Sequence, residues 1–415
     1  MSDAIFSTTL SCGLPLVAER VPGVRSVAVC WLLPVGCGYD RADREGVSTM
    51  LSEMVFRGAG SLDSRAQADA LDHLGLARGA DVGGHYLRFS ATMLADRLEP
   101  AWPLFVDIVR SPTLDAAAME PVRELSLQAL AGLADEPQEK AALVLSDRHN
   151  DLPLNRTGMG TEAGLTAITR EDLQSAWRAN VNPQSSILAV AGAIDPDAIA
   201  ARLEKLLSGW NGATPALKTS PSPTRGTYHH VQDDSASQVH IFLAHEAPRE
   251  AHPHSLMERV ALAILSGGTS ARLFTEVREK RGLCYSVSAG YSAERDHGRV
   301  TGYVGTTPDK AQESLDVFRA ELSRIQTPQG AVTANEFNRA VVRFKTSLVF
   351  SGESTGSRAG ALASDMHRIG RPRSLAELAA AVDRLTLTDL NDYLRTRQTG
   401  PMTIVTLGPK PLEVS

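Results

Sequence analysis

The sequence is poor in the features that identify several large classes of protein. Its 415 residues include four cysteines with no C-x-x-C pair, so a disulfide framework is not expected. No run approaches the roughly 18 consecutive apolar residues of a membrane span, and residues 1–20 lack the basic stretch and apolar core of a secretory signal. A net charge of −6 argues against nucleic acid as a partner. These absences favour a reducing, cytoplasmic setting without a membrane.

The residues that are present indicate a globular chain with more than one domain. Hydrophobic residues make up 43% and charged residues 22% of the sequence, and domains usually contain roughly 100–200 residues. The stretch Asn211–Gly226 holds three prolines and no apolar periodicity, which is typical of an exposed linker. We therefore predict an N-terminal domain over residues 1–212, a linker over 213–226 and a C-terminal domain over 227–415. Cys30 and Cys284 sit among apolar residues and are expected to be small buried hydrophobes.

The two halves of the sequence contain the same strand, helix and turn patterns in the same order. Each begins with a strand-like run, Val27–Val35 or Gln238–Ala244. Each ends with a Thr-x-x-Asp helix start, a helical stretch, a turn and an apolar run, at 169–172 and 187–192 in the first half and at 386–389 and 403–408 in the second. Matching order at matching offsets favours internal duplication. The expected fold class is α+β, with two homologous domains in which helices pack on a sheet.

The stretch Gly46–Ala59, GVSTMLSEMVFRGA, has the spacing of a core helix, with apolar residues along one face. It also resembles the first helix of the pitrilysin/insulinase-like (inverzincin) zinc peptidases, G-x-A-H-F-L-E-H-M-x-F-x-G-T. The residues in register with that pattern are Gly46, Leu51, Met54, Phe56 and Gly58. The resemblance implies an α+β clamshell half whose domains carry mostly antiparallel sheets.

This chain lacks the metal-binding and catalytic residues that the family carries on that helix. The inverted motif H-x-x-E-H needs two imidazoles one helical turn apart and a carboxylate before the second. The corresponding positions here hold Thr49, Ser52 and Glu53, and the third ligand of the family falls at Ala129. Among the eleven histidines, the close pairs at 229–230 and 252–254 lie near turns and are expected to be solvated loop residues. We predict no catalytic metal in this chain.

A second candidate site lies in the other half. Leu265–Val287 reads LSGGTSARLFTEVREKRGLCYSV, which predicts a glycine turn, a helix and a strand beginning near Cys284. Leu273, Phe274 and Val277 are expected to point inward. Four positive charges lie near the expected end of this helix, on Arg272, Arg278, Lys280 and Arg281. A solvated basic helix end, favoured by the helix dipole, explains these charges without invoking function.

The same string resembles the second-domain pattern of the peptidase family, G-G-x-x-S/A-R-L-F-x-x-x-R-E-K-x-G-L-x-Y. In that family the arginine and the tyrosine seven residues later reach the zinc site of the facing domain. The resemblance places these roles on Arg278, as a donor to substrate oxygens, and on Tyr285, as a donor to the oxyanion. Gly267 and Gly268 would permit close backbone approach beside the substrate.

The absence of the zinc ligands together with the presence of Arg278 and Tyr285 predicts the zinc-less subunit of a heterodimeric metallopeptidase. By resemblance, a homologous partner with an intact H-x-x-E-H would hold the zinc, and this chain would be inactive alone. Peptides would bind by strand addition to a sheet edge. The sequence leaves open a purely structural or peptide-binding subunit, a homodimer that only binds peptides, and an active peptidase with a novel metal site. It identifies neither the partner nor the peptide.

Overall fold

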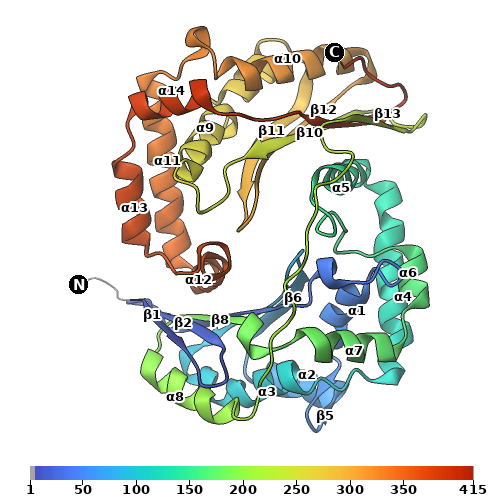
Figure 1. Ribbon diagram of the computed structural model, residues 1–415, viewed down its shortest axis with the longest axis vertical. Coiled ribbons are helices and arrows are strands. Elements are labelled where there is room, and N and C mark those ends of the chain that lie inside the picture. Colours follow the sequence, from blue (N-terminus) through green and yellow to red (C-terminus); the bar gives the residue numbers. More distant parts are fainter. Residues whose placement is uncertain (1–4, 415) are drawn as a thin grey trace. The chain divides into compact units, whose positions relative to one another are not determined.

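The computed structural model describes residues 5–414, which belong to two compact units, each assembled from three stretches of chain (Figure 1). Unit 1 comprises Met1–Gly132, Asp151–Ser220 and Ser351–Ser374. Unit 2 comprises Leu133–Asn150, Pro221–Phe350 and Leu375–Ser415. The units therefore differ from the sequential domains expected from the linker, because each half contributes one helical segment to the other unit.

Unit 1 is built on a sheet with strand order β1-β2-β8-β3-β7-β6. Its strands are β1 (Phe6–Thr9), β2 (Pro15–Arg20), β3 (Ser26–Leu33), β6 (Ala77–Val82), β7 (Leu87–Leu94) and β8 (Ile187–Gly192), with a separate pair β4 (Gly58–Ala59) and β5 (Leu62–Asp63). Its helices are α1 (Val47–Met54), α2 (Ser64–His73), α3 (Leu98–Arg110), α4 (Ala116–Gly132), α6 (Glu162–Ala167), α7 (Arg170–Asn180), α8 (Pro196–Leu206) and α12 (Thr355–Ile369). Only β2 and β8 are parallel neighbours.

Unit 2 repeats this design in a sheet with order β11-β12-β10-β13-β9. Its strands are β9 (Tyr228–Gln232), β10 (Val239–Ala247), β11 (Cys284–Ala293), β12 (Gly298–Thr306) and β13 (Thr403–Gly408). Its helices are α5 (Pro137–His149), α9 (Ser255–Ser266), the π-helical turn η5 (Phe274–Glu279), α10 (Ala311–Arg324), α11 (Ala334–Glu353, whose last three residues are assigned to unit 1), α13 (Leu375–Asp383) and α14 (Leu387–Thr396). Again one neighbouring pair is parallel, β13 with β9. The shared order and strand directions confirm the duplicated α+β fold.

The exchange of helices follows from central strands that are apolar on both faces. Successive side chains of β3 alternate between two cores. One core is covered by helices of the same half, whereas α12 covers the other face with Ala359, Leu362 and Ala363. Small residues such as Ala28 and Cys30 on that face let the helix approach closely. Cys30 is therefore a buried hydrophobe, as predicted, and burial raises the pKa of its thiol to about 11.

The central strand of unit 2, β10, is likewise apolar on both faces and needs a cover on each. Ile241 and Leu243 of β10 face the core that α9, α10 and α14 complete. On the other face, Phe242 packs with Ala141 and Leu145 of α5. Each sheet thus receives its second cover from a helix of the other half of the sequence.

Local predictions at the ends of the halves are confirmed. Thr169 and Asp172 form a reciprocal capping box at the start of α7, and Thr386 caps α14 by accepting from the Asp389 amide at 3.1 Å. The predicted runs at 187–192 and 403–408 are β8 and β13.

The interpretation of the paired histidines is corrected for one pair. His229 and His230 lie in β9, which pairs with β13, and the Nδ1 atom of His230 is 2.9 Å from the Thr406 hydroxyl. The turn expected there ends at Gly226, and the strand that contains both histidines begins two residues later at Tyr228. His252 and His254 do precede α9 in a loop. Within residues 5–414, no helix is both long and apolar enough to cross a bilayer.

Candidate functional site

The positions on α1 that correspond to zinc ligands are occupied by groups already engaged in local hydrogen bonds. The Thr49 hydroxyl donates to the Gly158 carbonyl at 2.7 Å, and the Ser52 hydroxyl donates to the Thr49 carbonyl at 2.7 Å. Glu53 is half-buried, and Ala129 is exposed on α4, which packs against α1. Catalytic zinc sites take imidazole, thiolate and carboxylate ligands, and of these α1 offers one carboxylate. In the part of the chain that the structure describes, no group of three or more potential ligands is arranged to hold a metal.

The start of α1 is fixed by Asp40, six residues before the helix N-cap. Its carboxylate accepts hydrogen bonds from the Gly46 amide at 2.9 Å and from the Ser48 amide and hydroxyl at 3.0 Å each. These bonds satisfy N–H groups that the first helical turn leaves free. Burial raises the pKa of Asp40 to about 6, although the hydrogen bonds and the charge of Arg156 act to lower it.

The raised pKa of Asp40 predicts a pH-dependent stability of unit 1. Because the folded state holds the proton more tightly than the unfolded state, this contribution is full below the unfolded pKa near 3.8 and is lost as pH rises through about 6. Relative to an Asp40→Asn variant, the free energy of unfolding should fall by about 2 kcal/mol between pH 4 and pH 7. Urea titrations followed by tryptophan fluorescence would measure it. Parallel profiles for the two proteins would refute the assignment.

Arg278 lies at the C-terminal end of an irregular helix. After one short stretch of α-helix the chain widens into the π-helical turn η5. Leu273, just before this turn, and Val277 within it are buried as predicted. Phe274 is half-buried, and the Arg278 guanidinium carbon stands 4.9 Å from the centre of its ring. Single π turns occur frequently at functional sites. Arg278 is exposed, so its donors are available to a ligand.

Tyr285 occupies a bulge at the start of β11. The register with β12 passes from Cys284 opposite Thr306 to Ser286 opposite Gly305, which leaves Tyr285 without a partner residue. The bulge turns its side chain outward, and Tyr285 is 71% exposed. An exposed aromatic residue held by an irregular backbone is typical of a ligand contact rather than of a core.

Arg278 and the start of β11 are electrostatically coupled. Burial raises the pKa of the Cys284 thiol, and the positive charge of Arg278 acts in the opposite direction. The Gly282 amide donates to the Arg278 carbonyl at 3.0 Å, which closes the turn between helix and strand. The two predicted residues, Arg278 and Tyr285, therefore flank one tight turn.

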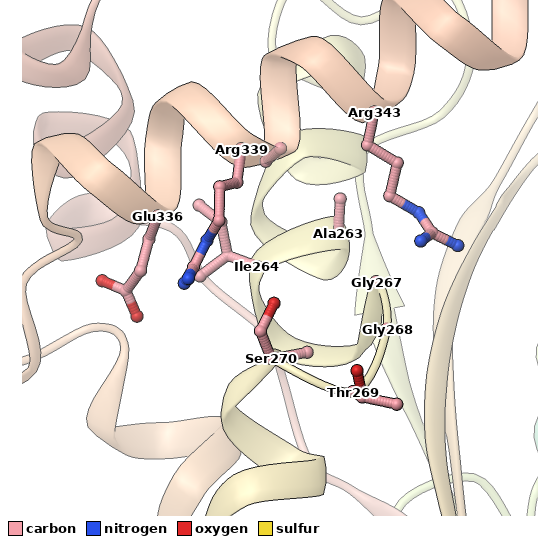
Figure 2. Close-up of a pocket in the computed structure, with 11 residues that line it drawn as sticks. Ala263, Ile264, Gly267, Gly268, Thr269, Ser270, Glu336, Arg339 and Arg343 are labelled. Atoms are coloured by element: carbon pink, nitrogen blue, oxygen red, sulfur yellow. The ribbon is translucent and has the colours of Figure 1, made fainter.

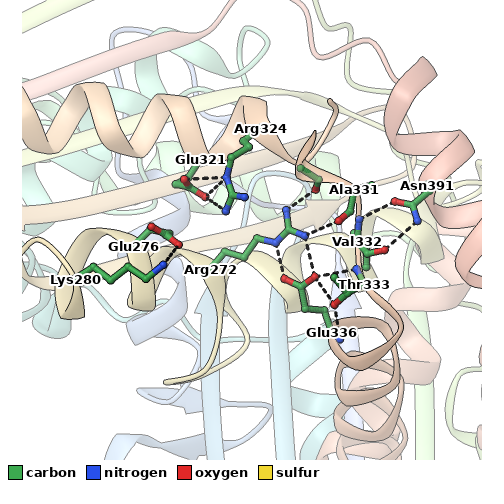
Figure 3. Close-up of polar contacts among 11 residues, drawn as sticks. Arg272, Glu276, Lys280, Glu321, Arg324, Ala331, Val332, Thr333, Glu336 and Asn391 are labelled. Atoms are coloured by element: carbon green, nitrogen blue, oxygen red, sulfur yellow. Dashed lines mark hydrogen bonds and ion pairs between the residues drawn. The ribbon is translucent and has the colours of Figure 1, made fainter. Parts of the chain in front are cut away.

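Arg272 departs from the interpretation of a solvated basic helix end. Its side chain is only 8% exposed and forms two hydrogen bonds with the Glu336 carboxylate at 2.6 and 2.9 Å (Figure 3). Two further donors reach the carbonyls of Gly330 and Ala331, at 2.7 and 3.2 Å. The Glu336 carboxylate is also held in place at the start of α11, where it accepts hydrogen bonds from the amide and the hydroxyl of Thr333. Arg272 thus fastens the helix that carries Arg278 to α11.

The glycine turn is packed tightly against the end of α9. A Cβ atom on Gly267 would lie 2.2 Å from the Ala263 carbonyl oxygen, and Gly268 has a φ of +150° that strains other residues. Both glycines line a pocket beneath α11 to which neither Arg278 nor Tyr285 contributes (Figure 2). This pocket therefore contains only one of the two predicted pairs of substrate residues, and sequence reasoning missed its α11 side, which includes Arg339 and Arg343.

Two family models match successive parts of the chain. Residues 16–162 match the family model described as insulinase (peptidase family M16), and residues 167–343 match the model described as peptidase M16 inactive domain.

Curated relatives match over nearly the whole chain. A protein of Mycobacterium leprae described as an uncharacterized zinc protease is 26% identical and covers 94% of this chain and 88% of its own length. A similarly described protein of Bacillus subtilis is 24% identical, with 96% of each chain covered.

Solved structures show the same fold. A peptidase M16 inactive domain from Pseudomonas fluorescens has a TM-score of 0.86 at 21% identity, covering 99% of both chains. A protease from Helicobacter pylori has a TM-score of 0.85 at 18% identity, covering 98% of this chain and 100% of the other.

Proposed function

Because this chain belongs to the insulinase-type peptidase family M16, we propose that it is the non-zinc subunit of a heterodimeric metallopeptidase. In this proposal a homologous partner carries H-x-x-E-H and the zinc, while this chain supplies Arg278 and Tyr285. The observation that carries it is the contrast between the two sites. The zinc positions on α1 hold no ligand set, whereas a π turn and a bulge hold Arg278 and Tyr285 exposed on either side of one turn.

The two side chains have distinct chemical tasks. The planar guanidinium of Arg278 donates charge-assisted hydrogen bonds to carbonyl or carboxylate oxygens of the peptide and so positions it. The hydroxyl of Tyr285 donates to the oxygen that becomes negative when the scissile carbonyl turns tetrahedral. The proton remains on the phenol, because the hydroxyl acts as a donor and not as an acid. The partner's zinc would supply the activated water.

The place of β11 in the sheet supports peptide binding beside these residues. It is an edge strand, hydrogen-bonded to β12 on one side, and Tyr285 stands near its beginning. Extended peptides add to such edges through main-chain hydrogen bonds, which require little of the peptide's side chains. The Ser266 hydroxyl accepts from the Ala289 amide at 2.9 Å, so a peptide would pair with the part of the edge nearer Tyr285.

The partner and the compartment belong to the proposal as well. In this proposal the zinc is held by the partner, and peptides are the substrates. A reducing, cytoplasmic setting is consistent with cysteines that are all free thiols.

Peptidase activity tests the shared site directly. A quenched fluorescent peptide library would be incubated with this chain, with a homologous H-x-x-E-H chain, and with both together in the presence of zinc. We expect turnover in the mixture alone and its loss when a chelator is added. Full turnover by the partner, unchanged when this chain is added, would instead make this chain a structural or peptide-binding subunit.

A further inference from the structure

A second polar site lies in unit 2, in a pocket of about 260 Å³ between the loop after α9 and the side of α11. The loop contributes Gly267 to Ala271, and α11 contributes Glu336, Arg339, Ala340 and Arg343. Figure 2 shows Arg339 and Arg343 extending from α11 toward the loop, with the hydroxyls of Thr269 and Ser270 pointing toward the helix. Hydrogen-bond donors therefore converge on this space from both sides.

The two arginines of the pocket carry charges that the chain does not neutralise. Across residues 5–414, neither Arg339 nor Arg343 takes part in an ion pair or a hydrogen bond. They stand four residues apart on one helix face, a spacing at which like charges destabilise a helix. The carboxylate nearest in sequence, Glu336, is held by Arg272 and Thr333, and although burial acts to raise its pKa, those bonds lower it to about 2. Glu336 is thus ionised but already paired.

The loop opposite the arginines offers further unused donors. The backbone N–H groups of Gly268, Thr269 and Ser270 form no hydrogen bond with other described residues, and neither do the two hydroxyls. The absence of a side chain on Gly268 lets Arg343 approach, because a Cβ there would lie 3.3 Å from its Nη1 atom. Successive loop amides together with guanidinium groups are the usual donors to oxyanions in proteins.

We infer that this pocket binds a small oxyanion, a phosphate or a carboxylate, between Arg339 and Arg343 on α11 and the loop Gly268–Ser270. The five donors of an arginine and the loop amides match the several acceptor oxygens of such a group. Two sources share this chemistry, a free phosphate and the carboxylate of a peptide. The site requires neither zinc nor a partner chain, so it stands apart from the proposed peptidase role.

Calorimetry on the full-length chain tests the site. Inorganic phosphate would be titrated at low ionic strength into the unaltered protein and into an Arg339→Gln/Arg343→Gln double variant. We expect the double variant to bind phosphate at least about tenfold more weakly, and binding to the unaltered protein to weaken as salt rises. An Arg384→Gln variant, which removes one exposed charge elsewhere in unit 2, should bind like the unaltered protein.

A second arm identifies the source of the oxyanion. A short peptide with a free C-terminal carboxylate would compete with phosphate, whereas its amidated twin would not, if the natural ligand is a peptide carboxylate. Equal, negligible competition by both peptides would assign the site to free phosphate. The inference is overturned if neither phosphate nor the carboxylate peptide binds, or if the double variant binds both as well as the unaltered protein does. None of these outcomes depends on peptidase turnover.

Discussion

Replacing Tyr285 by phenylalanine is expected to lower kcat of the zinc-partner mixture by about two to three orders of magnitude, the usual cost of losing one oxyanion donor. The substitution removes a single hydroxyl from a side chain that is 71% exposed. Folding and assembly should therefore persist. KM should change little, because the hydrogen bond forms chiefly when the carbonyl becomes tetrahedral. Initial rates on one quenched peptide, with size-exclusion chromatography of the mixture, would measure both quantities.

Two comparisons make this test specific. An Arg278→Gln variant should raise KM as well as lower kcat, since the guanidinium is proposed to hold the peptide before and during reaction. A Tyr228→Phe variant removes a hydroxyl that bonds within unit 2, 2.9 Å from the Thr406 hydroxyl, and should leave turnover intact. If Tyr285→Phe retained full turnover while the mixture still hydrolysed peptide, the catalytic role of Tyr285 would be wrong and a structural role would stand.

The elements that could be predicted from the sequence are those determined by neighbouring residues. Thr169 and Asp172 lie three residues apart, so their reciprocal bonds need no tertiary contact. The apolar runs at 187–192 and 403–408 are buried strands because they are too short for a core helix and follow turns. Arg278 and Tyr285 were selected as candidates by the family resemblance, and the π turn and the bulge that expose them leave no periodic signal in the sequence.

Features that depend on distant contacts were not predictable in this way. Arg272 looks like its basic neighbours in sequence, and only the approach of Glu336, 64 residues away, buries it. The exchange of α5 and α12 is likewise set by which sheet face lacks a cover. One unused signal was present in the sequence. Arg339 and Arg343 form a like-charge pair at i, i+4, and the nearest acidic residue, Glu336, is within three or four residues of Arg339 alone.

Replacing Arg272 by methionine is expected to destabilise unit 2 by about 1–3 kcal/mol, because the half-buried Glu336 would lose the ionic partner that is itself only 8% exposed. The same change would leave the carbonyls of Gly330 and Ala331 without their donors. All four tryptophans lie in unit 1, so fluorescence reports on that unit alone. Hydrogen exchange of amides in β10 and β12 would report the loss in unit 2, while the fluorescence transition in urea serves as the internal reference.

A double variant separates the ion pair from other effects of the substitution. With Arg272→Met and Glu336→Leu together, no unpaired charge remains, and most of the lost stability should return. An Arg281→Gln variant breaks an exposed pair with Glu276 and should cost no more than about 1 kcal/mol. Equal losses in Arg272→Met and Arg281→Gln would mean that the pair is a surface contact. In that case apolar contacts would hold α11 in its place in unit 2. The arrangement of the oxyanion pocket would then not depend on Arg272.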